Sequence, residues 1–187
     1  MGWILPLAAA GLLVLAGIWA AWIWRRLRRL GQNVSRAFAT LSALFAERHR
    51  QVPSLVEVLG EGAGRSHRNA ALQACKAAMS AQGSNQQAAS EGVLQTAIGD
   101  LVLIGEAHPT LRADPRFRAL EADLARLDNR IAAARRVFNR AVADYNAALA
   151  RRPDAFLAFA LGFRQEAFFD VGETQRQALE GPPALPF

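Results

Sequence analysis

The longest amphipathic stretch of the chain is ADPRFRALEADLARLDNRIAAARRVFNRAVADYNAALARRP, residues 113–153. Its start is predicted by Asp114, a typical helix cap, and by Pro115 at the first helical position, where a missing N–H costs no hydrogen bond. Apolar residues then form a nearly unbroken heptad seam as far as Pro153: Leu120, Leu124, Leu127, Ile131, Ala134, Phe138, Tyr145 and Leu149. A helix of about 57 Å, at about 1.5 Å per residue, needs partner helices along its length. The stretch therefore predicts an all-α fold built as an elongated antiparallel bundle.

The N-terminal segment predicts a membrane anchor. Residues 3–24 carry no charge, and as a helix they would span about 33 Å, close to a hydrocarbon core of about 30 Å. All four tryptophans of the chain lie near the two ends of this segment, where aromatic rings suit the headgroup level. A cleaved signal peptide is the alternative, but such peptides place positive charge before a shorter apolar core.

Four arginines follow the apolar segment directly: Arg25, Arg26, Arg28 and Arg29. By the positive-inside rule they place the N-terminus outside and the bulk of the chain in the cytoplasm. They are also expected to contact anionic headgroups of the lipid bilayer. The formal net charge is +6, but 22 basic residues less these four leave 18 against 16 acidic ones, or +2. The body therefore offers no basic stripe for nucleic acid.

The apolar seam of the anchor continues into the body as one rod. Its members recur at three- and four-residue steps: Leu27, Leu30, Val34, Phe38, Leu41, Leu44, Val52, Leu55 and Leu59. Pro53 is expected to kink or locally break this rod, and the glycines of LGEGAGRS, residues 59–66, are expected to end it.

Two shorter helices are expected before the long one. Ser66 is predicted to cap the first, which runs to about Met79. Ser84 and Gln87 have the spacing of a capping box for the second, which Pro109 stops. Three segments result: a transmembrane anchor at 1–24, a cytoplasmic helical bundle at 25–170 and a flexible tail at 171–187.

Polar residues on the long helix form a candidate protein-interaction strip beside the seam: Asn129, Arg135, Asn139 and Asn146. Alanine would be a better helix former at these positions, so the asparagines need another reason. One interpretation is a polar network inside the bundle that fixes helix register. The other is a docking surface for another protein.

No pattern of residues indicates catalysis. The strip supplies neither a nucleophile nor a base, and the three histidines lie far apart without a metal-ligand pattern such as HExxH. GEGAG lacks the strand that a phosphate loop requires. The single cysteine, Cys75, excludes an internal disulfide and is expected to be a half-buried helix residue. The sequence thus predicts no enzyme, cofactor or metal ion.

Several motifs resemble the LemA family of bacterial membrane-anchored helical proteins. NRIAAARRVFNRAVADYN at 129–146 is similar to the family pattern ENRIAxARxxYNxAVxxYN, with Asp128 in place of Glu and Phe138 in place of Tyr. EAHPTLRADPRF at 106–117 and VPSLVEVL at 52–59 are similar to two further family patterns. The resemblance continues through Pro153, Ala158, Gly162, Phe163, Phe168 and Phe169.

The resemblance implies a helical bundle behind a single membrane anchor, in the bacterial inner membrane. It implies a non-enzymatic adaptor or scaffold that binds an inner-membrane partner, with an HtpX-type metalloprotease in envelope stress as the expected client. A magnetosome branch of the family implies the alternative, a homo-oligomer that self-assembles and organises or remodels the membrane.

Overall fold

A computed structural model describes residues 3–151 and 154–169, and within these residues it contains helices and no strand. This confirms the prediction of an all-α fold. The helices are α1 (Ile4–Leu59), the 3-10 helix η1 (Gly60–Ala63), α2 (Gly64–Ser80), α3 (Gly83–Ala107), α4 (Pro109–Arg112), α5 (Pro115–Ala150) and α6 (Asp154–Ala160).

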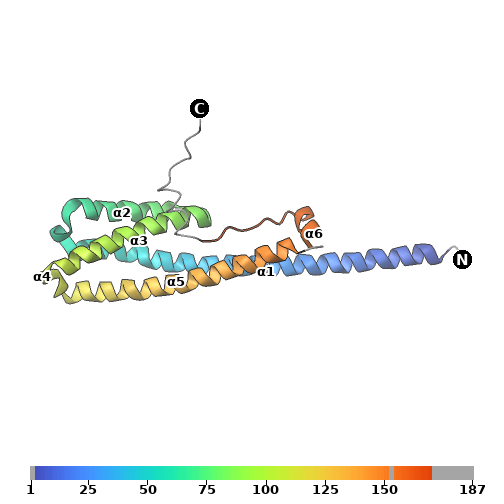
Figure 1. The fold of residues 1–187 in the computed structure, drawn as a ribbon, viewed down its shortest axis with the longest axis horizontal. Coiled ribbons are helices and arrows are strands. Elements are labelled where there is room, and N and C mark those ends of the chain that lie inside the picture. Colours follow the sequence, from blue (N-terminus) through green and yellow to red (C-terminus); the bar gives the residue numbers. More distant parts are fainter. Residues whose placement is uncertain (1–2, 152–153, 170–187) are drawn as a thin grey trace, which may run out of the picture.

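Two long antiparallel helices, α1 and α5, form the spine of the molecule (Figure 1). The hairpin of α2 and α3 covers the half of the spine that is remote from the N-terminus. After α6 the chain turns at Gly162 and runs back along the other half as residues 163–169, which we call the strap. The N-terminal part of α1 projects beyond the bundle, with Leu12 to Trp24 largely exposed.

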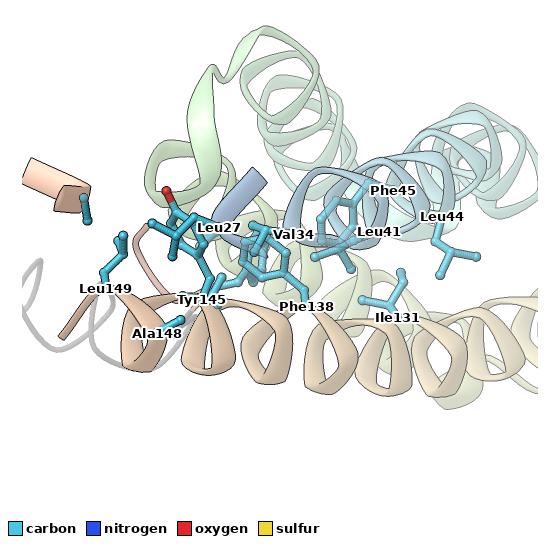
Figure 2. Packing of buried hydrophobic residues seen from close by; sticks show 14 of the residues in the cluster. Leu27, Val34, Leu41, Leu44, Phe45, Ile131, Phe138, Tyr145, Ala148 and Leu149 are labelled. Atoms are coloured by element: carbon cyan, nitrogen blue, oxygen red, sulfur yellow. The ribbon is translucent and has the colours of Figure 1, made fainter. Parts of the chain in front are cut away.

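The apolar core has two parts. The first joins α1 to α5 and the strap, and Figure 2 shows the side chains of Phe138 and Tyr145 directed from α5 toward α1. The second joins the end of α1 to α2, α3 and the beginning of α5, around Leu55, Leu101 and Phe117. The seam predicted on α5 is buried at six positions: Leu124, Leu127, Ile131, Phe138, Tyr145 and Leu149.

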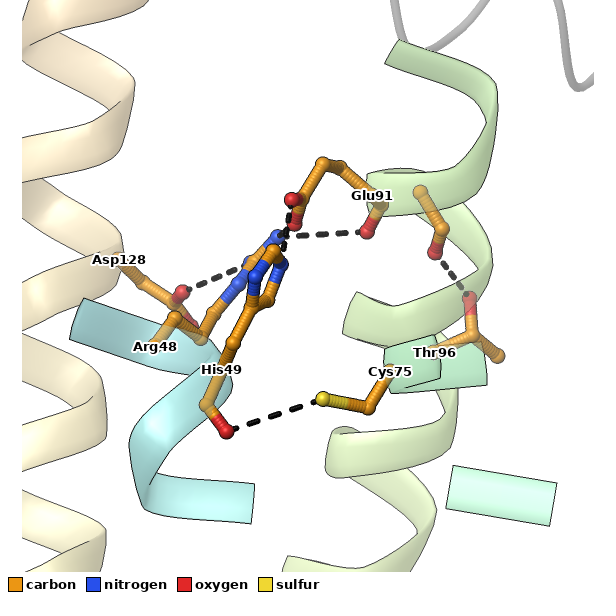
Figure 3. Close-up of polar contacts among 7 residues, drawn as sticks. Arg48, His49, Cys75, Glu91, Thr96 and Asp128 are labelled. Carbon is orange, nitrogen blue, oxygen red and sulfur yellow. Dashed lines mark hydrogen bonds and ion pairs between the residues drawn. The ribbon is translucent and has the colours of Figure 1, made fainter. Parts of the chain in front are cut away.

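The helix α1 continues past Pro53, so the predicted local break is wrong. Val52 and Leu55 on either side are fully buried, and their packing holds the helical path. Proline has no N–H to donate to the carbonyl four residues earlier, which belongs to His49. The thiol of Cys75 on α2 donates to that carbonyl instead, at 3.7 Å (Figure 3). A neighbouring helix thus replaces the missing hydrogen bond.

The helix starts were predicted with mixed success. Asp114 caps α5 as expected, because its carboxylate accepts from the Arg116 N–H at 2.7 Å. Ser66 and Ser84 are not caps: α2 begins at Gly64 and α3 at Gly83, where glycines with positive φ turn the chain. At the start of α3 the Gln82 N–H donates to the side chain of Gln86 at 3.1 Å. This bond satisfies one of the backbone N–H groups that have no partner within the helix.

The end of the long helix agrees with its predicted position. The helix α5 has 36 residues, ends at Ala150, and is followed by α6 from Asp154. Gly162 then adopts φ of 77°, a conformation that disfavours other residues, and this ends the helical path. The predicted flexible tail, residues 171–187, lies outside the described residues.

Candidate functional site

Two asparagines of the predicted strip bind the backbone of the strap. The Asn139 amide donates to the Phe169 carbonyl at 3.1 Å and accepts from the Phe169 N–H at 2.8 Å. Asn146 repeats the arrangement on Glu166, donating at 2.8 Å and accepting at 3.0 Å. Each amide therefore satisfies one main-chain donor and one main-chain acceptor, as a neighbouring strand would.

The spacing of the two contacts matches the geometry of both elements. Seven helical residues separate the asparagines, or about 10.5 Å at about 1.5 Å per residue. Their partners Glu166 and Phe169 are three residue steps apart, or about 10 Å when extended at about 3.3 Å per residue. The order of the pairs also shows that the strap runs antiparallel to α5. An asparagine every two turns thus fits one extended chain along this helix.

The end of the strap is anchored by an aromatic side chain. Phe169 is buried, with its ring 5.5 Å from that of Phe45 on α1 and 6.4 Å from that of Phe138 on α5. Burying a phenylalanine contributes about 1.5–3 kcal/mol, comparable to the two hydrogen bonds of Asn139 together. The neighbouring Phe168 is half-exposed. Backbone and side-chain contacts therefore act together at the end of the described strap.

The other members of the strip lie in different surroundings. Asn129 is exposed, and Arg135 lines a cavity of about 70 Å³ between α3, α5 and Phe169. Val142, between Asn139 and Asn146 on α5, is fully buried and belongs to the core. The structure thus brings Asn139 and Asn146 together on the strap and places Asn129 and Arg135 nearer the α2–α3 hairpin.

A buried ionic cluster lies where the two parts of the core meet (Figure 3). Arg48 on α1 pairs with the buried Glu91 of α3 and lies 3.3 Å from the Asp128 carboxylate of α5. The His49 ring contacts the second oxygen of Glu91 at 2.7 Å. The Arg48 guanidinium also stacks over Phe45, which links the cluster to the strap. Three helices are thus joined through one arginine.

The cluster has a structural rather than a reactive composition. The single thiol of the chain, that of Cys75, lies close to the cluster. Its pKa is raised above the ordinary value, mainly by burial and to a smaller extent by the charge of Glu91. A protonated thiol is a poor nucleophile. Within residues 3–151 and 154–169, no group of three or more His, Cys, Asp or Glu side chains is arranged to hold a metal ion.

The sequence did not point to this cluster. The sequence indicated no role for the histidines, yet the side chain of His49 is only 9 % exposed and packs against Glu91. His108 lies at a helix end, with its ring bonded to the Ile104 carbonyl at 2.8 Å. The missed signal was an arginine in register with the seam of α1, at position 48 between Phe45 and Val52.

The predicted membrane-surface arginines surround α1 just after its apolar part. Arg26 stacks over Trp22 and Arg28 over Trp24, at 5.7 and 5.0 Å to the ring centres. Arg25, Arg26 and Arg29 line a cavity of about 890 Å³ between α1 and the end of α5, whereas Arg28 does not. One helix of the described chain, α1, is long and apolar enough to cross a membrane.

Comparison with known proteins agrees with this architecture. Residues 37–181, most of the chain, match the LemA family. The chain belongs to the LemA family. The match begins within α1 after the arginines and includes every element that contacts the strap.

Curated relatives from two organisms are similar to part of this LemA chain. The chain is 31 % identical over 80 residues to the magnetosome protein MamQ of Magnetospirillum gryphiswaldense, and the aligned region covers 43 % of this chain and 29 % of the relative. The proteins MamQ 1 and MamQ 2 of Paramagnetospirillum magneticum are 29 % identical over the same length. The chain thus matches less than a third of each relative.

The family match and the exposed apolar part of α1 together indicate a membrane-associated protein. Neither the family nor these relatives is named for a catalytic activity. This coarse description agrees with the cluster and the strip, whose contacts hold the bundle together.

Proposed function

We propose that this LemA protein is a membrane-anchored, non-enzymatic adaptor or scaffold. Its N-terminus lies outside the bacterial inner membrane, and its bundle lies in the cytoplasm, where it binds and organises another inner-membrane protein. The observation that carries the proposal is the continuity of α1. Its 56 residues form one helix from the apolar segment to the remote end of the bundle. A bundle connected in this way presents its surface at a fixed height above the bilayer, which suits a docking platform.

The client suggested by the family resemblance is an HtpX-type membrane metalloprotease in envelope stress. The docking surface of the proposal is the part of α5 around Asn129 and Arg135, next to the end of the strap. Val137 in this region is 62 % exposed, an apolar side chain that a partner could cover. Val137 lies about two helical turns after Asn129 on a neighbouring face of α5, and an exposed apolar side chain near exposed polar ones favours recognition of a protein.

The test is extraction of the full chain from native membranes in mild detergent, by a C-terminal tag, followed by mass and composition measurements. The expected product is a particle with one defined protein partner. The Asn129→Ala/Arg135→Ala variant should lose that partner. An Arg140→Ala variant on an exposed position of the same helix should retain it. A monomer with no partner in gentle detergent would contradict the proposal.

The alternative is a self-assembling scaffold that organises or remodels the membrane. It is favoured by α6, whose Phe156 and Phe159 are 75 % and 88 % exposed on a short helix that contacts α1 and α5. The similarity to magnetosome proteins also supports it. Extraction would then give a large homomer, and reconstituted protein would cluster in vesicles and change their shape. Unchanged vesicles with dispersed protein would contradict this alternative.

A further inference from the structure

A cavity of about 890 Å³ between α1 and the end of α5 is not used by the proposed function. The α1 side is formed by residues at successive turns of one helix face: Ile18, Ala21, Trp22, Arg25, Arg26, Arg29, Leu30 and Asn33. The α5 side is formed by its last two turns and the residue after them: Asp144, Ala147, Ala148 and Arg151.

The lining changes from apolar to basic along the direction of α1. Ile18, Ala21 and Trp22 belong to the apolar segment, and the arginines begin with the next turn. From Ile18 to Arg29 the helix rises by about 16 Å, at about 1.5 Å per residue. The apolar end of the cavity therefore lies toward the membrane and the basic end toward the bundle, as in a site for an amphiphile.

The basic end carries an excess of positive charge. Four arginines line the cavity, three from α1 and Arg151 from α5, against the single carboxylate of Asp144. Among the residues that the structure describes, Arg25, Arg29 and Arg151 form no ion pair. A guanidinium fork binds phosphate oxygens in pairs, and the phosphodiester of a lipid headgroup presents a pair of charged oxygens that this fork matches.

We propose that this cavity binds the headgroup of one anionic phospholipid. The phosphate lies among Arg25, Arg29 and Arg151, and the acyl chains leave past Ile18 and Trp22 into the bilayer. The volume lies in the range of about 300–1,000 Å³ that is typical of small-molecule sites. A water-soluble phosphate would leave the apolar end unfilled, so the lining favours a lipid. The inference rests on the membrane anchoring of the proposed function and adds a defined lipid ligand to it.

The two sides of the cavity explain why a lipid would be bound specifically. Arginines on α1 alone could attract any anionic surface in a diffuse way. Arg151 is the residue directly after α5, remote in sequence from the arginines of α1, and meets them only in the folded bundle. A lipid held by both helices would therefore fasten the end of α5 to the anchor.

The test uses the full chain in an uncharged maltoside detergent and native mass spectrometry. The probes are dioleoylphosphatidylglycerol, dioleoylphosphatidylcholine and inorganic phosphate. Arg29→Gln/Arg151→Gln removes two cavity charges. Arg28→Gln/Arg36→Gln removes two charges from exposed positions of α1 outside the cavity and is the matched control. Circular dichroism and the thermal midpoint confirm that both variants fold.

The expected result is retention of one phosphatidylglycerol per chain, with the zwitterionic lipid bound more weakly. The cavity variant should weaken retention by about tenfold or more, since each membrane-surface arginine contributes about 1 kcal/mol or more, and the control by less than about threefold. Equal losses in the two variants would show diffuse attraction and overturn the proposal. Displacement of the lipid by millimolar inorganic phosphate would overturn the lipid assignment. The lipid-binding assay uses purified protein without any protein partner. Absence of a partner in native extracts would therefore contradict the proposed function and leave the lipid proposal unaffected.

Discussion

At the scale of single residues, the side chains of Asn139 and Asn146 on α5 make the hydrogen bonds to the strap backbone that a neighbouring β-strand would otherwise make. An extended segment packed against helices has unpaired backbone groups, and each buried group without a partner costs about 1–3 kcal/mol. Asn139 and Asn146 each provide both a donor and an acceptor, which no aliphatic or acidic side chain can do. Their presence within an alanine-rich helix follows from this double role.

The first prediction concerns Asn139. Replacing it with aspartate keeps the acceptor for the Phe169 N–H but sets an oxygen against the Phe169 carbonyl, where an amide now donates at 3.1 Å. We expect the end of the strap to detach more often, with hydrogen exchange at the Phe169 amide faster by roughly 5- to 150-fold, for a loss of about 1–3 kcal/mol. Asn129→Asp is the control at an exposed position. Equal exchange in both variants would contradict the role of Asn139.

The second prediction concerns the buried arginine. Arg48→Ala leaves Glu91 as a buried charge without its partner, so we expect destabilisation by about 3–5 kcal/mol. Replacing both members, as in Arg48→Met/Glu91→Leu, removes that penalty and should restore most of the stability. Thermal unfolding of the three proteins in detergent checks the order. A double variant as unstable as Arg48→Ala would show that the pair itself, rather than desolvation, determines the effect.

The sequence indicated a role for the asparagines of α5 but not for their partners in the strap or for Arg48, and each outcome has a physical reason. The asparagines could be recognised because they depart from the helix-forming preference of their neighbours. Their partners could not, because an irregular segment that is 20 or 30 residues away has no periodicity to place it. Arg48 was missed because a charged residue in a seam is usually assigned to the surface.

At the scale of elements, periodicity predicted the helices well and their ends less well. The long seams of α1 and α5 are buried as expected because many positions contribute to each prediction. The local break expected at Pro53 does not occur, because Cys75 on another helix bonds the carbonyl that proline leaves without a partner. Helix starts at Gly64 and Gly83 were missed because glycine turns replaced the expected serine caps.

The third prediction compares two glycines of α3. A Cβ at Gly105 would lie 2.9 Å from Leu59 and would also collide with the ring of Phe117, whereas at Gly99 it would meet open space. Gly105→Ala should therefore destabilise by about 1–3 kcal/mol through overpacking, and Gly99→Ala should stabilise by about 0.5–1 kcal/mol. The two thermal midpoints should move in opposite directions. A shift of the same sign for both would contradict the close approach at Gly105.

At the scale of the whole molecule, the strap and the hairpin perform the same task on two halves of one spine. The α2–α3 hairpin covers the remote half of α1 and α5, and the strap covers the half nearer the apolar part of α1 (Figure 1). The all-α class and the bundle could be predicted from the seams. The division into two covers could not, since it depends on where along the spine α2 ends and α3 begins.

The fourth prediction uses Cys75 to report on the remote half. The thiol is buried between α1 and α2, so we expect Ellman's reagent to react with it only when the hairpin opens, far more slowly than in the unfolded chain. Reaction at the unfolded rate would contradict this packing.

The same thiol gives the fourth prediction a pH dependence. Burial raises its pKa in the folded state, so the folded chain binds the proton more strongly. The resulting stability is present below the unfolded pKa of about 8.5 and is lost as pH rises through the higher folded value. The wild type should therefore lose stability relative to Cys75→Ala between about pH 8 and 10. A constant difference across that range would contradict the shift.

In the proposed membrane-anchored arrangement, the unbroken path of α1 also makes the molecule a lever with its pivot in the bilayer. From Arg25 to Leu59 the helix extends about 52 Å, at about 1.5 Å per residue. Transmembrane helices change tilt when the thickness of the surrounding bilayer changes. A change of about 10° at the pivot would then move the far end of the lever by about 9 Å, since the arm is about 52 Å long. A small change in membrane thickness would thus be transmitted as a displacement of about two helix turns at the tip.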